Sequence, residues 1–200
     1  MQHGGAGAGL SGRTRRSLAH LGLSIPAAAV LWWLPSHYGS TVLVLSAVLA
    51  LLMDLLRLHN PRVARLFAGL VGEMFRPEEE LRLCRATTLA AGFALVAVLF
   101  PVQPAVAGML YAGMADPAAS LVGRRFGRFR YGNGKSLSGA AAFAVVALGI
   151  GICLPFISFL QACLLASGLA ALEVAWGRWD DNLLLPLAGA AGVWFLSGFG

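Results

Sequence analysis

Seven long apolar runs dominate this chain of 200 residues. A helix needs about 17 to 25 mostly apolar residues to cross a bilayer, and several of the runs approach or exceed that length. Only 12% of the residues are charged and 58% are hydrophobic, whereas ordinary globular chains carry about 25% charged residues. The chain is therefore expected to be an all-α, polytopic membrane helix bundle. Its seven expected transmembrane helices cover roughly residues 18–34, 40–57, 86–101, 104–124, 139–155, 156–174 and 183–199.

Charged residues are unevenly distributed between the segments that join these runs. The segments PSHYGS, PVQP and LPFIS contain no Arg, Lys, Asp or Glu, and all 15 basic residues fall in the other segments. Because cytoplasmic loops carry an excess of Lys and Arg, the N-terminus is expected to be cytoplasmic and the C-terminus outside. The net charge of +6 then reflects membrane orientation, and no nucleic-acid partner is expected.

The domain organisation is simple. Residues 1–15 are expected to form a flexible tail, and residues 16–200 a single integral membrane domain. Within it, the segment 61–80 carries apolar residues at helical spacing, interleaved with Arg62 and Arg65. This pattern predicts an amphipathic helix on the cytoplasmic membrane surface. A solvated helix packed on the bundle is the alternative. The apolar positions are Val63, Leu66, Phe67, Leu70, Val71 and Met74.

Asp116 lies well inside the fourth apolar run. An ionised side chain at such a position costs about 2.5–3.5 kcal/mol, so it is a candidate functional residue by default. Pro117 follows directly, and an Asp-Pro pair can begin a helix with Asp as its N-cap. A break of this kind inside the membrane is tolerated where it lines a polar cavity. The alternative is an Asp that caps a kinked helix without contacting a ligand.

A basic, glycine-rich segment follows Asp116 and contains the only lysine of the chain, Lys135. Its end, RYGNGKS, is not a P-loop, because Phe129 occupies the position of the first required glycine. Arg side chains bind phosphate oxygens in bidentate fashion, and glycines let backbone N–H groups approach them. The segment therefore suggests an anion site, although a loop that only sets topology would also be basic. Either Ser136 or Ser138 could be the N-cap of the fifth run.

Further polar residues fall on the same side of the membrane. Glu173 ends the sixth run, and Asp180, Asp181 and Asn182 precede the seventh. Carboxylates beside phosphate-binding arginines are the ligands that a magnesium–nucleotide site requires. The alternative is a set of helix ends that happen to carry acidic residues.

Five motifs in order along nearly the whole chain resemble those of the CTP-dependent lipid kinases, the family of dolichol kinase, phytol kinase and yeast-type diacylglycerol kinase. They are RRSLAH, EELRLCRAT, ADPAASLVGRRFGR, GKSLSG and LEVAWGRWDDNLLLPL. Three positions depart from the family pattern: Ser17 replaces a lysine, Arg85 a glycine and Ser138 a glutamate.

The resemblance implies transfer of the γ-phosphate of CTP to the hydroxyl of a membrane lipid alcohol. It implies catalytic and Mg²⁺-binding roles for Asp116, Glu173 and Asp181. Additional contributions are expected from Arg16, His20 and Glu79. The residues expected to bind the nucleotide and its phosphates are Gly123, Arg124, Arg125, Gly127, Arg128, Lys135, Ser136 and Asn182.

Two other functions are weighed against this one. A CTP:phosphatidate cytidylyltransferase shares part of the motif architecture, but its closing His-Gly-Gly…Asp-Arg signature is absent from this sequence. A transporter would use Asp116 as a proton or ion site, but seven spans without an evident internal repeat argue against it. The expected partners are CTP, the lipid alcohol and the bilayer, in the cell membrane with the site facing the cytoplasm. The oligomeric state stays open, and a dimer is compatible with the sequence.

Overall fold

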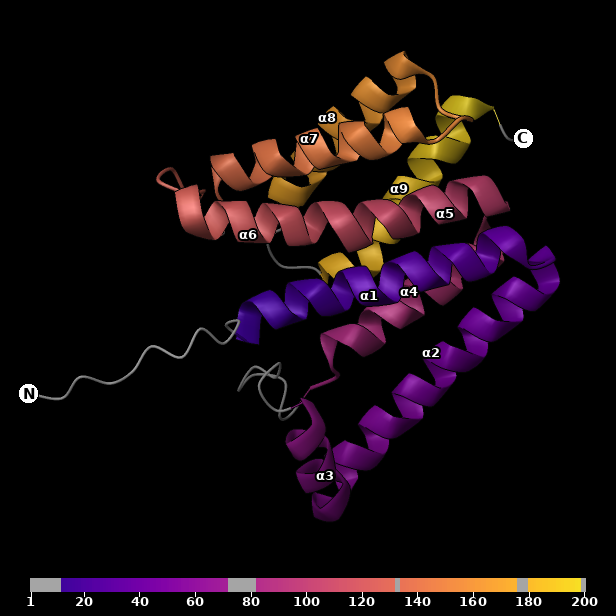
Figure 1. Ribbon diagram of the computed structural model, residues 1–200, viewed down its shortest axis with the longest axis vertical. Coiled ribbons are helices and arrows are strands. Elements are labelled where there is room, and N and C mark those ends of the chain that lie inside the picture. Colours follow the sequence, from indigo (N-terminus) through magenta and orange to yellow (C-terminus); the bar gives the residue numbers. More distant parts are fainter. Residues whose placement is uncertain (1–11, 72–81, 132–133, 176–179, 199–200) are drawn as a thin grey trace, which may run out of the picture.

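The computed structural model describes residues 12–71, 82–131, 134–175 and 180–198, and all named elements in these ranges are helical (Figure 1). The predicted all-α class is therefore confirmed for the described residues. In chain order the elements are α1 (Gly12–Trp33), α2 (Ser36–His59), α3 (Pro61–Val71), α4 (Arg85–Leu99), α5 (Val102–Leu110), the π-helical turn η3 (Tyr111–Ala115), α6 (Asp116–Phe126), α7 (Leu137–Cys153), α8 (Phe159–Ala175) and α9 (Asp181–Ser197).

A helix coincides with each of the seven predicted spans when α5, η3 and α6 are taken as one continuous helix. Two of these helices, α2 and the continuous helix Val102–Phe126, are long and apolar enough to cross a membrane. The apolar helices Ser17–Trp33, α4, α7 and α8 are shorter. Seven membrane crossings, and the orientation of the two termini, therefore stay predictions.

Two boundaries differ from the sequence-based expectation. Residues 12–15 form the first turn of α1 rather than the end of a flexible tail, because the helix continues beyond its apolar run; residues 1–11 lie outside the described part. The segment 61–80 is helical from Pro61 to Val71, residues 72–80 lie outside the described residues, and the placement of this helix on the cytoplasmic membrane surface stays a prediction. The Arg57 guanidinium of α2 lies 5.7 Å from the Phe67 ring centroid, whereas Leu66 is exposed. Helix α3 therefore packs on the end of α2 and also presents apolar surface outward.

Helix α5 runs through the centre of the bundle, and its residues from Pro104 to Met109 are all buried. It packs closely on α9 because Gly108 and Gly189 face each other: a β-carbon on Gly108 would lie 2.3 Å from the Pro186 carbonyl oxygen. Small residues at such crossings let helix backbones approach one another. Figure 1 shows α7 and α8 on one side of this centre and α2 at the opposite edge.

The continuous helix Val102–Phe126 contains one irregular turn, and it corrects the predicted helix break at Asp116. Asp116 has helical backbone angles, and Ala115, which precedes it and occupies the N-cap position of α6, is also helical. The π turn at Tyr111–Ala115 precedes it instead. Pro117 has no N–H to donate to a preceding carbonyl, and the wider hydrogen-bond spacing of a π turn accommodates that loss without ending the helix.

Candidate active site

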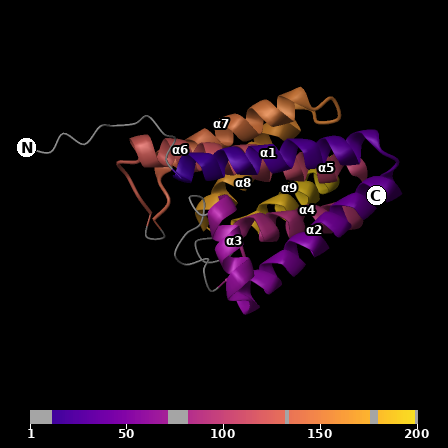
Figure 2. The same ribbon diagram turned by 60° about the horizontal axis from the view of Figure 1, so that its bottom comes forward.

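Four of the predicted site residues meet at one end of the bundle, although they come from four different elements. Asp116 begins α6, Lys135 lies in the α6–α7 connection, Glu173 lies in the last turn of α8, and Asp181 begins α9. Figures 1 and 2 show the end of α8 and the start of α9 near α6, on the side of the molecule toward which α6 runs. We call these four residues the carboxylate–lysine cluster.

Lys135 is the centre of this cluster. Its Nζ lies 3.0 Å from Glu173 Oε1 and 3.0 Å from Asp181 Oδ2. Burial lowers the pKa of Lys135, but the carboxylates of Asp181 and Glu173 raise that pKa more, so it lies above the ordinary value for lysine. The side chain is therefore a cation at neutral pH, with an exposed fraction of only 19%.

Asp116 belongs to the same electrostatic environment. The charges of Asp181, Lys135, Glu173 and Arg85 all act on its carboxylate. Arg85 is the first residue of α4, so a fifth element contributes to the site. Three carboxylates thus face two cations, an arrangement that can bind an anion only if further positive charge accompanies it.

One carboxylate oxygen of the cluster has no hydrogen-bond partner among the described residues. Asp181 Oδ1 is buried, and no hydrogen-bond donor reaches it in the described part of the chain. Buried carboxylate oxygens are normally paired, so this atom is suited to a ligand hydroxyl or a cation. Among the described residues, no three His, Cys, Asp or Glu side chains are close enough together to form a metal cage. The carboxylates of the cluster therefore suit Mg²⁺ only if one or two of them bind the ion together with the phosphates of a substrate.

The loop that carries Lys135 is held by its own backbone. The Tyr131 N–H donates to the Lys135 carbonyl at 2.7 Å, and the Gly134 N–H donates to the Tyr131 carbonyl at 2.8 Å. Gly134 has a φ of 83°, which is a left-handed conformation that glycine adopts without strain. Arg130 Nη1 also donates to the Gly134 carbonyl at 3.0 Å. These contacts fix the loop end from which the Lys135 side chain enters the bundle.

Ser136 is the N-cap of α7, as one of the two sequence-based alternatives predicted. Its Oγ accepts the Gly139 N–H at 3.1 Å. The α6–α7 crossing closes around this serine, because a β-carbon on Gly123 would lie 2.6 Å from Ser136 Oγ and one on Gly127 would lie 2.8 Å from Ser136 Cβ. The structure thus gives Gly123, Gly127 and Ser136 a packing role, and their contact with phosphate stays a prediction.

Comparison with known proteins gives three informative relatives. The chain is 26% identical to CTP-dependent diacylglycerol kinase 1 of Schizosaccharomyces pombe, over 68% of this chain and 71% of that protein. It is 27% identical to the protein of the same name in Eremothecium gossypii, over 74% of this chain and 55% of that protein. An uncharacterized Rickettsia prowazekii protein is 29% identical, over 70% of this chain and 73% of its own length. The chain is a relative of the CTP-dependent lipid kinases. No family model and no solved structure matches it.

The other residues predicted from the lipid-kinase resemblance differ in how far they are exposed. Arg124, Arg125 and Arg128 are exposed at the end of α6 and just beyond it, and Arg124 donates to Ser120 Oγ. Their contact with phosphate is therefore a prediction about the loaded site. Asn182 is buried, and its Nδ2 lies 3.5 Å from Thr88 Oγ1 of α4. Asp180 caps α9 by accepting the Asn182 N–H at 3.0 Å, which leaves the Asp181 side chain for the cluster.

The structure describes part of the first kinase-like motif, RRSLAH. His20 is buried on α1, and Ser24, one turn further along, donates to its carbonyl at 2.7 Å. A β-carbon on Gly113 of η3 would overlap the Ser24 side chain, so α1 and η3 are in close contact there. Arg16 lies within α1, but its side chain is outside the described part of the structure, as is Glu79.

Sequence reasoning missed three contributors to this end of the molecule. Arg85 was noted only as a departure from the lipid-kinase pattern, and Thr88 was not singled out. The third is the buried pair Asp54–Arg57 in α2, with 2.8 Å between Arg57 Nη2 and Asp54 Oδ1. Asp54 Oδ2 also accepts the Cys84 N–H at 2.6 Å, so the pair holds the segment that leads into α4. Its sequence signal was an acid and a base three residues apart at the end of an apolar run.

Proposed function

We propose that this protein is a CTP-dependent lipid kinase that phosphorylates the hydroxyl of a membrane lipid alcohol. The observation that carries the proposal is the carboxylate–lysine cluster, in which Lys135 Nζ lies 3.0 Å from both Glu173 and Asp181. The names of the two relatives called CTP-dependent diacylglycerol kinase 1 support both the donor and the class of acceptor. A diacylglycerol, polyprenol or phytol would each supply the required hydroxyl.

The reaction forms one bond and breaks one. The lipid hydroxyl oxygen attacks the γ-phosphorus of CTP, and the bond from that phosphorus to the β–γ bridging oxygen breaks. The products are a lipid phosphate and CDP, and the hydroxyl proton passes to a carboxylate. Asp116 and Asp181 are the candidates for that proton, because Glu173 is nearly buried beside Lys135. Phosphoryl transfer depends mainly on positioning and charge neutralisation, which suits a site without a nucleophilic side chain of its own.

The positive charges have separate roles. Lys135 and Arg85 would neutralise phosphate oxygens inside the site, and the exposed Arg124, Arg125 and Arg128 would hold the outer part of the triphosphate. Mg²⁺, held by Asp181 and Asp116 or Glu173 together with the phosphates, would supply further charge neutralisation when bound. The buried, unpaired Asp181 Oδ1 is the atom that supports such a ligand. The site would face the cytoplasm, where CTP is made, in a multi-pass protein of the cell membrane.

The test is a reconstituted assay with purified protein in mixed micelles. CTP should be converted to CDP only when a lipid alcohol and Mg²⁺ are both present, with a lipid phosphate formed in equal amount. A cytidylyltransferase would instead release pyrophosphate from CTP and phosphatidate. CDP formation that does not depend on lipid, or pyrophosphate as the product, would refute the proposal. A panel of nucleotides and lipid alcohols then identifies the donor and the acceptor.

A further inference from the structure

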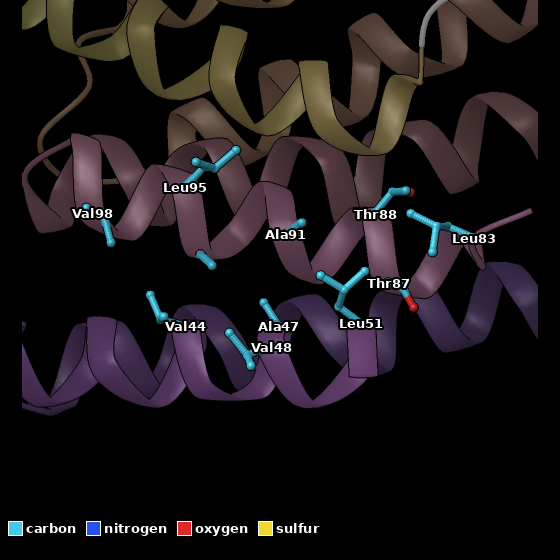
Figure 3. Close-up of a pocket in the computed structure, with 11 residues that line it drawn as sticks. Val44, Ala47, Val48, Leu51, Leu83, Thr87, Thr88, Ala91, Leu95 and Val98 are labelled. Carbon is cyan, nitrogen blue, oxygen red and sulfur yellow. The ribbon is translucent and has the colours of Figure 1, made fainter. Parts of the chain in front are cut away.

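An apolar groove of about 320 Å³ runs between α2 and α4 (Figure 3). One wall consists of α2 side chains and the other of α4 side chains with Leu83 just before them. The surface of the groove is apolar, and the two threonines among its lining residues stand at one end. The residues that line it are Val44, Ala47, Val48, Leu51, Leu83, Thr87, Thr88, Ala91, Ala94, Leu95 and Val98.

The threonine end of the groove adjoins the carboxylate–lysine cluster. Thr88 Oγ1 lies 3.5 Å from Asn182 Nδ2, and Asn182 directly follows Asp181, which contacts Lys135 at 3.0 Å. The opposite end is formed by Val44 and Val98, which Figure 3 places together, far along both helices from Thr87. A molecule that fills the groove therefore has one end beside the site and the other at membrane depth.

The dimensions of the groove identify what fits in it. From Thr87 to Val98 a helix rises about 17 Å, so the groove is long enough for much of one extended alkyl chain. A helix about 10 Å across could lie over the groove but could not enter it, whereas a single alkyl chain can. Val98 and Val48 are exposed, so the chain can enter sideways from the bilayer.

We infer that this groove binds one straight acyl chain of the lipid acceptor and thereby selects a diacylglycerol over a methyl-branched polyprenol or phytol. The inference rests on the proposed kinase function. With its chain between α2 and α4, the glycerol part of the acceptor lies at the end of the groove beside Thr87, Thr88 and Asn182. Its free hydroxyl then faces Asp181 and Asp116. The methyl branches make an isoprenoid chain wider than a straight acyl chain, so it packs less closely between the two helices.

The first experiment fills the groove. Ala47→Phe and Ala91→Phe place a ring between the helices, whereas Ala141→Phe places the same ring on an exposed position of α7 and is the matched control. A shift of about 1 Å at the reacting atoms can cost on the order of 10²-fold. Both groove variants should therefore lower kcat/KM for a long-chain diacylglycerol at least about tenfold. The KM for CTP and the turnover of dihexanoylglycerol, whose chains are too short to span the groove, should stay unchanged.

If the groove-filling variants fold poorly, a second variant and a direct probe still test the inference. Leu51→Ala widens the groove and should raise relative turnover of phytol over diacylglycerol. A diacylglycerol with a diazirine midway along one acyl chain should label wild-type protein between residues 87 and 98 or 44 and 51. Labelling elsewhere, or groove variants that behave like Ala141→Phe, overturns the groove assignment while CDP formation by the wild type persists. Absence of any lipid-dependent CDP formation overturns the kinase proposal itself.

Discussion

Replacing Lys135 by methionine should damage both stability and turnover. The ammonium contacts two carboxylates at 3.0 Å, and the Glu173 side chain is only 8% exposed. Removing one partner of a buried ion pair costs about 3–5 kcal/mol, because the remaining charges are left uncompensated. Lys135 is itself 19% exposed, so we expect the lower end, about 3 kcal/mol. For a protein of this size the melting temperature should then fall by about 6–12 °C.

A double variant separates the two effects of that mutation. Lys135→Met combined with Glu173→Gln removes the carboxylate that was left without its cation, so at least half of the lost stability should return. Turnover should remain low in both variants, by the roughly 10²–10³-fold that loss of one charge-stabilising group costs. Arg130→Met is the matched control, because the Arg130 side chain lies in the same loop and makes one exposed hydrogen bond, to the Gly134 carbonyl, in the described structure, while backbone hydrogen bonds that do not involve this side chain hold the loop end. Arg130→Met should change neither the melting temperature nor the turnover appreciably.

The assay is turnover of CTP to CDP and thermal melting on the same detergent preparation. Turnover within twofold of wild type in Lys135→Met would show that the loop serves only topology. A double variant less stable than Lys135→Met would show that Glu173 does not depend on the lysine charge, which would refute the ion-pair reasoning.

The remaining predictions concern charge, packing and orientation. Because the pKa of Lys135 is raised, its stabilising charge is fully present below the unfolded value of about 10.4 and is lost only above it, so turnover between pH 6 and 9 should show no loss assignable to this lysine. Asp116→Asn keeps size but removes charge, so turnover should fall at least about 10²-fold while the melting temperature holds or rises; near-wild-type turnover would remove Asp116 from the site. Gly108→Ala should cost about 1–3 kcal/mol by overpacking α5 against α9, whereas Gly149→Ala, with no atom within 4 Å of the new β-carbon, should be neutral in melting. A reporter fused after Gly200 should read as outside and one inserted near Gly132 as cytoplasmic; the reverse pattern would turn the proposed site away from its nucleotide.

The helices of the fold were largely predictable because all of them except α3 coincide with a long apolar run in the sequence. Each predicted span coincides with a helix, and the start of α7 at Leu137 agrees with one of the two serines that the sequence offered as its N-cap. The position of α3 was also predictable, because its apolar residues recur at helical spacing. Local periodicity carries this information without any knowledge of how the helices pack.

The composition of the site was predictable only in part. Asp116, Lys135, Glu173 and Asp181 stand out as ionisable residues in or beside apolar runs, and they do meet in the structure. The pairing of Lys135 with two carboxylates could not be predicted, because it depends on how α6, α8 and α9 end relative to one another. Arg85 and Thr88 were missed for the same reason: they are ordinary residues until the start of α4 is brought beside α9.

The π turn before Asp116 shows most clearly what sequence alone does not reveal. An Asp-Pro pair is compatible with a helix start, a kink or a continuous helix, and local preference does not decide among them. The decisive contacts are tertiary: Gly113 admits the Ser24 side chain of α1, and Tyr111 packs against Gly189 of α9. One additional residue in a helical turn rotates everything after it by about 100°. The direction of the Asp116 side chain relative to α5 is thus set by how α1 and α9 hold η3, and the same packing brings that carboxylate to Lys135.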